Sequence, residues 1–195
     1  SAIIGRSPRM VEILRVIDRL SKSCAPVLVN GESGTGKERI ARAIHAGSGR
    51  SREPFIPVNC AAIPEHLAES LLFGPRRGAF SGAVQNQSGY FALTDDGTLC
   101  LDEISEMPLP IQAKLLRVFE SGNVLPLGAR EESAVDVRVP ASSNQNLDTN
   151  IKQGRFRADL YYRLAAYSFT ISPLWERQED IPLLARYFLT SFRRR

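Results

Sequence analysis

A glycine-rich segment at residues 31–38 constrains the fold of this chain more than any other feature. It follows an apolar run at 27–29, precedes a segment with the apolar spacing of a helix, and reads Gly31-Glu32-Ser33-Gly34-Thr35-Gly36-Lys37-Glu38. This order is that of a Walker A loop, and the alternative is a glycine-rich turn before a helix. The glycines let backbone N–H groups face phosphate oxygens, and Lys37 adds a positive charge. The segment therefore predicts a phosphate-binding site in an α/β fold.

An acidic pair follows a second apolar segment. Residues 98–101 are predicted to form a strand, and Asp102 and Glu103 come directly after it. Ligands of open α/β sheets lie at the carboxyl ends of strands, so this pair is expected beside the phosphate loop. We expect Asp102 to hold Mg²⁺, usually through water, and Glu103 to orient or deprotonate an attacking water. Because Glu38 stands where Ser or Thr usually ligates magnesium, more of the metal binding falls on Asp102.

Helical and extended segments alternate along the chain. Apolar spacing predicts helices at 8–20, 36–46, 64–72, 110–120 and 181–192, and strands at 27–29, 55–58, 98–101, 124–127 and 135–139. Ser7 and Pro8 are expected to cap and start the first helix. The alternation predicts a three-layer α/β fold, with a parallel sheet covered by helices on both faces. The chain ends directly after the last helix, so we expect a domain that is cut short.

Composition narrows the class of protein. The 195 residues, 43% of them hydrophobic, suffice for the core of one globular domain. The net charge of +4 is scattered along the chain, and helix-turn-helix, zinc-finger and RNA-binding patterns are absent. No apolar run is long enough to span a membrane, and no signal-peptide pattern begins the chain, so we expect a cytoplasmic protein.

The cysteines and histidines give no indication of catalysis. Cys24, Cys60 and Cys100 lack the spacing of metal ligands and lie beside apolar residues, so buried, reduced thiols are expected. His45 and His66 have no carboxylate or cysteine partner at catalytic spacing, which favours structural or solvated roles.

A short segment between the two phosphate-site motifs reads Gly78-Ala79-Phe80-Ser81-Gly82-Ala83. An exposed phenylalanine between glycines is costly in water, and apolar residues presented to solvent usually mark an interaction site. The alternative is that Phe80 packs into the core beside a flexible turn. We interpret the segment as a protein-contact loop with Phe80 at its tip.

With these motifs in place, the chain resembles the central AAA+ domain of sigma-54-dependent transcriptional activators, the bacterial enhancer-binding proteins. The resemblance covers nearly all 195 residues and rests on the motifs above and on segments at 58–62, 72–74, 112–118, 136–139, 156–164 and 176–181. It implies an AAA+ P-loop NTPase core at 1–172. Residues 173–195 would form a linker and the first helix of a lid subdomain that is only begun.

The resemblance also implies an activity and partners. Domains of this family bind and hydrolyse ATP with Mg²⁺, form homo-oligomeric rings of six or seven subunits, and contact sigma-54 and its RNA polymerase through the segment matching 78–83. DNA binding belongs to a separate C-terminal domain of the full-length proteins. Two other functions stay open, namely a general AAA+ protein remodeller and a nucleotide sensor that does not hydrolyse.

The resemblance also implies roles for two arginines. Arg157 and Arg163 match the arginine fingers that reach the nucleotide of the neighbouring subunit, and the competing interpretation is a salt bridge to Asp159 or Asp180. A guanidinium in the finger position stabilises charge on the transferred phosphoryl group. Activity is therefore expected to rise with oligomerisation.

Two asparagines match further family positions. Asn144 corresponds to the sensor of the γ-phosphate or of its attacking water. Asn59 corresponds to the switch residue that holds the catalytic glutamate inactive until the partner is contacted, whereas a cap of the next helix is the competing interpretation.

The chain departs from the family pattern at several positions. Ser81 replaces the usual Thr, Leu71 the usual Glu, and 75–77 read Pro-Arg-Arg where His-Glu-Lys is common, which changes the local charge. Pro140 is unusual inside a predicted strand, because proline gives up a ladder hydrogen bond. Trp175 stands where the family usually has Arg, and we interpret it as surface packing or an interdomain contact.

Overall fold

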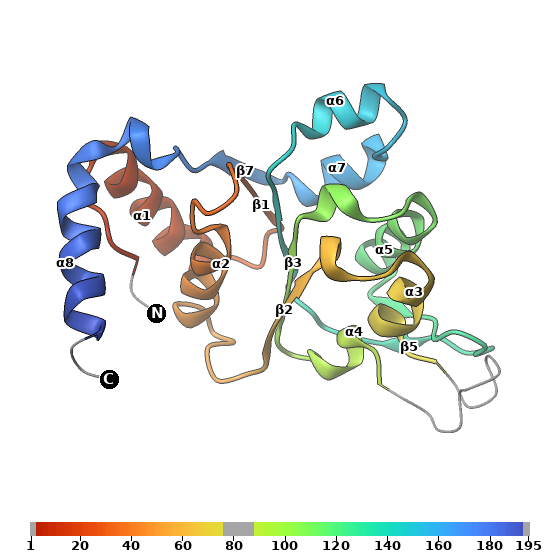
Figure 1. Ribbon diagram of the computed structural model, residues 1–195. Helices are drawn as coiled ribbons and strands as arrows, with labels where there is room; N and C mark the ends of the chain where they lie inside the picture. Colours follow the sequence, from red (N-terminus) through yellow and green to blue (C-terminus); the bar gives the residue numbers. More distant parts are fainter. Residues whose placement is uncertain (1–2, 76–87, 193–195) are drawn as a thin grey trace.

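Parallel strands form a five-stranded sheet through the centre of the molecule, in the order β2-β3-β6-β1-β7 (Figure 1). The computed structural model describes residues 3–75 and 88–192, so the contact segment at 78–83 and the Arg76-Arg77 pair lie outside the described residues. The strands are β1 (Val27–Asn30), β2 (Phe55–Asn59), β3 (Thr98–Asp102), β6 (Pro140–Ser143) and β7 (Tyr167–Thr170). Two short strands, β4 (Asn123–Val124) and β5 (Ser133–Ala134), form a separate antiparallel ribbon.

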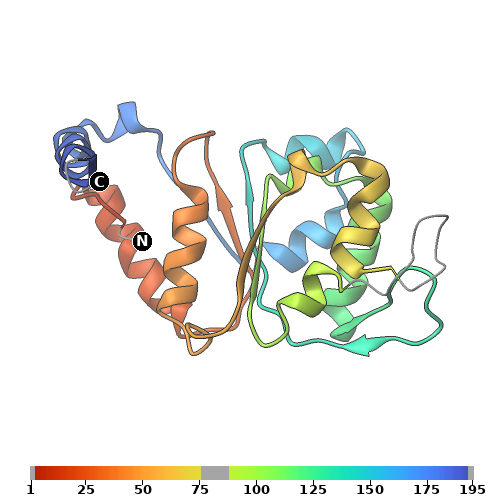
Figure 2. The ribbon, with the colours of Figure 1, turned by 60° about the horizontal axis from the view of Figure 1, so that its bottom comes forward.

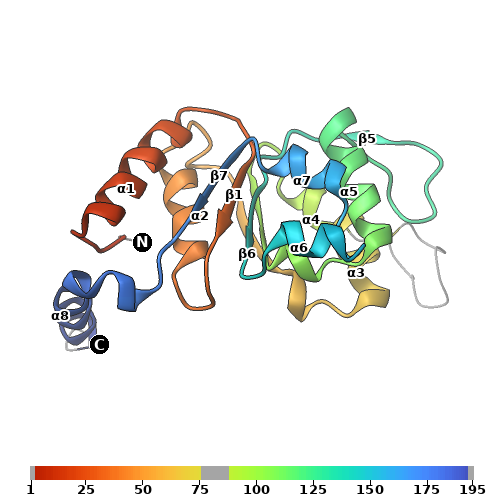
Figure 3. The same ribbon diagram turned by 90° about the horizontal axis from the view of Figure 1, so that it is seen from above.

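Helices cover both faces of the sheet and complete the predicted three-layer α/β fold. On one side lie α1 (Pro8–Ser21), α2 (Lys37–Ala46) and α8 (Ile181–Phe192) (Figure 1, Figure 2). On the other side lie α3 (Glu65–Phe73), α4 (Tyr90–Leu93), α5 (Leu109–Ser121), α6 (Leu147–Lys152) and α7 (Ala158–Leu164) (Figure 3). The described residues also form the short 3-10 helices η1 (Cys60–Ala62), η2 (Ile104–Glu106), η3 (Leu174–Glu176) and η4 (Gln178–Asp180). Within the described residues, no helix is both long and apolar enough to cross a membrane.

Side chains of β1 divide between two hydrophobic cores. Val27 and Val29 pack with α1 and α2, whereas Leu28 packs with the helices of the opposite face. This division follows from the alternation of side chains along a strand. Because β1 is buried on both faces, its carboxyl end is fixed, and the phosphate loop that follows starts from a rigid position.

Two of the predicted strands are wrong in extent. Of residues 124–127 only Val124 belongs to a ladder strand, and of residues 135–139 only Arg138 makes a bridge, to Thr98. The chain joins the sheet at Pro140, which pairs with Val27 as the first residue of β6. Proline is tolerated at the first position of a strand, so its missing N–H removes no bond from the sheet interior.

The sequence patterns did not predict β7, α4, α6 or α7. The three helices have 4, 6 and 7 residues, too few for a repeating apolar spacing to emerge. β7 is an edge strand with largely exposed residues, and its pairing with β1 makes it part of the sheet. By contrast, α2 and α8 lie within a residue of the predicted ranges.

Asp180 fastens the N-terminal segment to η4. Its carboxylate is fully buried and accepts hydrogen bonds from the N–H of Arg6 (2.6 Å), the N–H of Ser7 (2.9 Å) and the hydroxyl of Ser7 (2.7 Å). The expectation that the Ser7 side chain caps α1 was therefore wrong, because its hydroxyl donates to Asp180. Burial favours a raised pKa for Asp180, but the hydrogen bonds from Arg6 and Ser7 outweigh it and the pKa is lowered.

Replacing Asp180 by Asn is expected to destabilise the fold by about 1–3 kcal/mol at neutral pH, because buried donors lose a charged acceptor. Since the folded-state pKa is lowered, this contribution is complete above the unfolded pKa of about 3.9 and disappears as pH falls through the folded pKa. Urea unfolding of both proteins, from neutral pH down to about pH 3, measures the effect. Asp18→Asn, which removes an exposed carboxylate paired with Lys22, is the control. A stability difference that stays constant in acid would contradict the assignment.

Candidate functional site

The phosphate loop joins β1 to α2 and has the backbone shape that its glycines favour. Gly34 and Gly36 have φ angles of 79° and 97°, which residues with a side chain rarely adopt. Thr35 closes the turn, since its N–H and hydroxyl both donate to the carbonyl of Glu32, at 3.3 and 2.8 Å. Among the described residues, no acceptor pairs with the N–H groups of Gly34, Gly36 and Lys37. Unpaired N–H groups at a helix start suit an anion such as phosphate.

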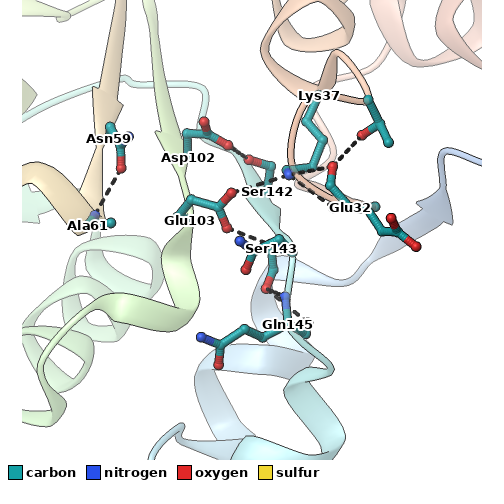
Figure 4. A network of polar contacts seen from close by, with 12 residues as sticks. Glu32, Lys37, Asn59, Ala61, Asp102, Glu103, Ser142, Ser143 and Gln145 are labelled. Carbon is teal, nitrogen blue, oxygen red and sulfur yellow. Dashed lines mark hydrogen bonds and ion pairs between the residues drawn. The ribbon is translucent and has the colours of Figure 1, made fainter. Parts of the chain in front are cut away.

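A buried network at the carboxyl edge of the sheet links the loop to the acidic pair (Figure 4). The Lys37 Nζ atom lies 3.0 Å from the carbonyl oxygen of Gly31 and 3.3 Å from the Glu103 Oε1 atom. The other carboxylate oxygen of Glu103 accepts a hydrogen bond from the N–H of Asn144, at 3.0 Å. Lys37 is only 6% exposed, so its ammonium group relies on these partners for the hydrogen bonds that water would otherwise supply. The structure thus brings together three of the predicted site residues, Lys37, Glu103 and Asn144.

Glu103 has an uncommon backbone conformation. Its φ and ψ angles are 54° and 50°, in the left-handed region, although it is not a glycine. Such conformations cost about 1–3 kcal/mol and are found preferentially at functional sites. This conformation turns the chain sharply after β3 and orients the carboxylate toward Lys37 and Asn144.

Asp102 ends β3 and accepts a hydrogen bond from the hydroxyl of Ser142 on β6 (Figure 4). The described residues contain no group of three His, Cys, Asp or Glu side chains that could enclose a metal. Mg²⁺ needs no such cage, because it is commonly held by one or two carboxylates, water and substrate phosphates. Asp102, at the same strand edge as the loop, fits this role. Glu38 is engaged elsewhere, by a hydrogen bond from Arg42 Nε at 2.8 Å.

Asn59 ends β2 directly opposite Asp102 in the parallel register. Its side-chain oxygen accepts a hydrogen bond from the N–H of Ala61 at 3.0 Å and so caps η1 (Figure 4). In this conformation Asn59 makes the helix cap of the competing interpretation. Its role as a switch for Glu103 stays a prediction.

Arg157 and Arg163 lie on the surface, at the start and in the last turn of α7. Arg157 donates to both carboxylate oxygens of Asp159, at 3.0 and 2.7 Å, and this hydrogen bonding raises the pKa of Arg157. Arg163 donates to the carbonyl of Phe119 at 2.6 Å. The alternative prediction was a salt bridge from these arginines to Asp159 or Asp180. In the described structure Arg157 forms the salt bridge to Asp159, and neither arginine bonds to Asp180. Both guanidinium groups are accessible to another molecule.

Two cavities flank the phosphate loop. One, of about 370 Å³, lies on the α1 and α8 side and has largely apolar walls that include Ile4, Ile171, Trp175 and Phe188. The other, of about 440 Å³, lies over the carboxyl ends of β1, β6 and β7 and is lined by polar residues that include Asn144. The loop therefore separates an apolar space from a polar one.

Two residues of the site were missed by sequence reasoning. Ser142 binds Asp102, and Arg177, which is 7% exposed, donates to the carbonyl of Thr35 at 3.2 Å. Arg177 thereby ties the segment after β7 to the phosphate loop. Neither residue has a spacing pattern of its own, although a serine two residues before Asn144, in a buried strand, is a usable signal.

Cys60, Cys100 and His45 are buried and have structural roles, whereas Cys24 is exposed. Burial, and then the charge of Asp102, raises the pKa of Cys100 to about 12, and the same two causes raise the pKa of Cys60. Both thiols therefore stay protonated at neutral pH. Cys24 is exposed, so the expectation of burial was wrong for this residue. His45 is buried, contacts the hydroxyl of Thr98 at 3.0 Å, and has its pKa lowered first by burial and then by Arg138.

Comparison with known sequences places the chain in one family. The profile of the family described as "Sigma-54 interaction domain" matches residues 3–170. The protein named "Putative uric acid sigma-54-dependent transcriptional regulator UacR" of Escherichia coli (strain K12) is 52% identical over 194 residues, which are 99% of this chain and 33% of UacR. The DNA-binding transcriptional regulator NtrC of Klebsiella pneumoniae is 50% identical over 187 residues, which are 96% of this chain and 40% of NtrC. The chain thus spans well under half the length of these relatives.

Solved structures agree with this assignment. The crystal structure of NtrX from Brucella abortus in complex with ATP has a TM-score of 0.90 and 35% identity, and it covers 98% of this chain and 43% of NtrX. NtrX in complex with ADP gives the same TM-score and identity. A P-loop NTPase domain from E. coli, at 21% identity and a TM-score of 0.59, shares the fold. The chain therefore belongs to the sigma-54 interaction domain family, the AAA+ P-loop domains of sigma-54-dependent transcriptional activators.

Proposed function

We propose that this chain hydrolyses ATP with Mg²⁺ and uses the reaction to remodel the closed complex of sigma-54 RNA polymerase. It engages sigma-54 through residues 78–83 and works within a homo-oligomeric ring. The names of UacR and NtrC support the role in transcription, and the NtrX complexes with ATP and ADP support the nucleotide.

The observation that carries the proposal is the contact of one carboxylate with both ends of the site. Glu103 pairs with Lys37 of the phosphate loop and accepts the N–H of Asn144 after β6. A general base has to lie within hydrogen-bond reach of its water while the phosphates are held by other groups. Glu103 thus contacts both the lysine proposed to bind phosphate and the asparagine proposed to sense it, which supports its proposed role as the base.

The geometry suggests a separate role for each of these residues in ATP hydrolysis. Phosphates on the loop N–H groups compete with Glu103 for the Lys37 ammonium, so nucleotide binding weakens the Lys37–Glu103 ion pair. The released carboxylate can then accept a proton from water beside Asn144. Asp102 would hold Mg²⁺, and the bound ion would supply positive charge to offset that of the phosphate oxygens. Arg157 or Arg163 of a neighbouring subunit stabilises the charge that develops on the transferred group.

A continuous path in the chain supports coupling of this site to the contact segment. Asn59 caps η1, η1 leads into α3, and α3 ends at Gly74. Gly89, one residue after the described chain resumes at Ser88, lies so close that a Cβ on it would be 2.3 Å from the Gly74 nitrogen. The described residues on either side of 76–87 therefore lie side by side. A displacement near Asn59 can thus reach the base of the contact segment through α3.

Phosphate release from ATP by the purified chain tests the chemical part of this proposal. Turnover is expected to require Mg²⁺ and to be lost in Lys37→Ala, because the loop then lacks its charge for the outer phosphates. Sedimentation in parallel identifies the concentrations at which the chain assembles. Nucleotide binding without phosphate release in assembled protein would instead favour a non-hydrolysing sensor.

A further inference from the structure

Trp175 was singled out in the sequence as a departure from the family pattern, and the proposed function gives it no role. It is the single tryptophan of the chain and lies in η3, between β7 and α8. Its side chain lines the apolar cavity beside the phosphate loop, yet the residue remains 61% exposed. A large aromatic side chain with so much exposed surface can pack against another molecule.

The backbone around Trp175 is held in place. Arg177, two residues on, donates to the carbonyl of Thr35 in the phosphate loop, and Glu176 pairs with Arg9 of α1. The Arg177 guanidinium also contacts the Met10 sulfur atom at 2.9 Å. The indole is therefore carried by a segment anchored to the loop itself, so its position relative to bound phosphates is set by the fold.

The cavity has the size and chemistry of a site for a flat organic group. Its volume of about 370 Å³ lies within the range of small-molecule sites, and its walls are mainly apolar, with Ile4, Ile171 and Phe188 among them. Residues 32–36 of the phosphate loop form its other wall. Of the two cavities beside the loop, this one has the apolar walls that suit the uncharged end of a ligand whose phosphates occupy the loop N–H groups.

We propose that Trp175 packs its indole against the base of the bound nucleotide and contributes to selection of a purine. This inference rests on the proposed function, because it assumes phosphates on the loop. Stacking is the interaction that an exposed indole offers to a heteroaromatic ring, and a purine presents more surface than a pyrimidine. The arginine usual in the family offers a charged plane at this position, so the base contact in this chain has a different character.

Binding measurements on the chain with and without a base test the inference. Trp175→Ala is expected to raise the Kd for ADP about 5- to 150-fold, the effect of losing one base–aromatic stack. The Kd for inorganic tripolyphosphate, which has no base, should stay unchanged. Trp175→Phe keeps an aromatic ring and should retain most of the affinity for ADP. Tyr167→Ala, which removes an exposed aromatic residue of β7 outside the cavity, is the matched control.

The fluorescence of the single tryptophan gives a second readout. ADP should change the Trp175 emission, UDP should change it less, and tripolyphosphate should leave it unaltered. Equal ADP affinity in wild type and Trp175→Ala, or equal loss of ADP and tripolyphosphate binding, overturns the inference while the proposed function stands. If wild type binds neither ADP nor tripolyphosphate, the proposed function fails as well.

Discussion

Replacing Arg157 or Arg163 by alanine is expected to lower the turnover of ATP by about 10³- to 10⁵-fold, the range found for arginine fingers of GTPases. Both side chains are exposed, and in the described structure neither is hydrogen-bonded to Lys37 or Glu103 of its own chain. Their present partners are Asp159 and a backbone carbonyl, which are weak competitors because exposed ion pairs contribute little. Fold stability should therefore change little in either variant.

Mixing two inactive variants tests whether the arginine acts on a neighbouring subunit. Lys37→Ala retains Arg163, and Arg163→Ala retains the phosphate loop, so assembled mixtures contain complete sites at some interfaces. Phosphate release should be restored in the mixture but in neither variant alone. Arg155→Ala, which removes an arginine bonded to Asn150 at 3.0 Å on the same surface, is the control and should keep full turnover. No recovery in mixtures that sedimentation shows to be assembled would count against a shared site.

Replacing Glu103 by glutamine is expected to lower the turnover of ATP by about 10²- to 10⁴-fold, the contribution of a general base. The substitution keeps the shape of the side chain and the acceptor for the Asn144 N–H, but it removes the negative charge. Nucleotide affinity should be equal or higher, because Lys37 is no longer paired with a carboxylate that competes with phosphate.

Glu106→Gln provides the comparison for this variant. Glu106 lies in η2, three residues after Glu103, and is exposed beside Gln145, which donates to it. Its substitution should leave turnover unchanged. A Glu103→Gln protein that binds ATP normally and hydrolyses it at the wild-type rate would show that the base lies elsewhere.

Local sequence patterns predicted those parts of the fold and site that depend on neighbouring residues. The phosphate loop could be located because Gly34 and Gly36 need left-handed angles next to a strand and a helix. Asp102 and Glu103 could be placed near it because parallel strands end at a common edge. The periodicity of α8 is long enough to define its limits.

Features that depend on distant residues could not be predicted in this way. β7 is a short, exposed edge strand whose identity comes from pairing with β1. The hydroxyl of Ser7 bonds to Asp180, 173 residues away, so a local rule for helix caps failed. The contact of Lys37 with Glu103 likewise joins residues 66 apart. In each case the structure is determined by a tertiary interaction, which produces no pattern in the local sequence.

Capture of purified sigma-54 by this chain in the presence of ADP and aluminium fluoride is the central test of the proposed function. The experiment compares wild type with Phe80→Ala, with Leu109→Ala as a control for an exposed apolar residue outside the contact segment. If residues 78–83 contact sigma-54, we expect capture that requires nucleotide, is lost in Phe80→Ala and is kept in Leu109→Ala. Absence of capture by wild-type chain that binds nucleotide and assembles, or capture that survives Phe80→Ala, would contradict the proposed function.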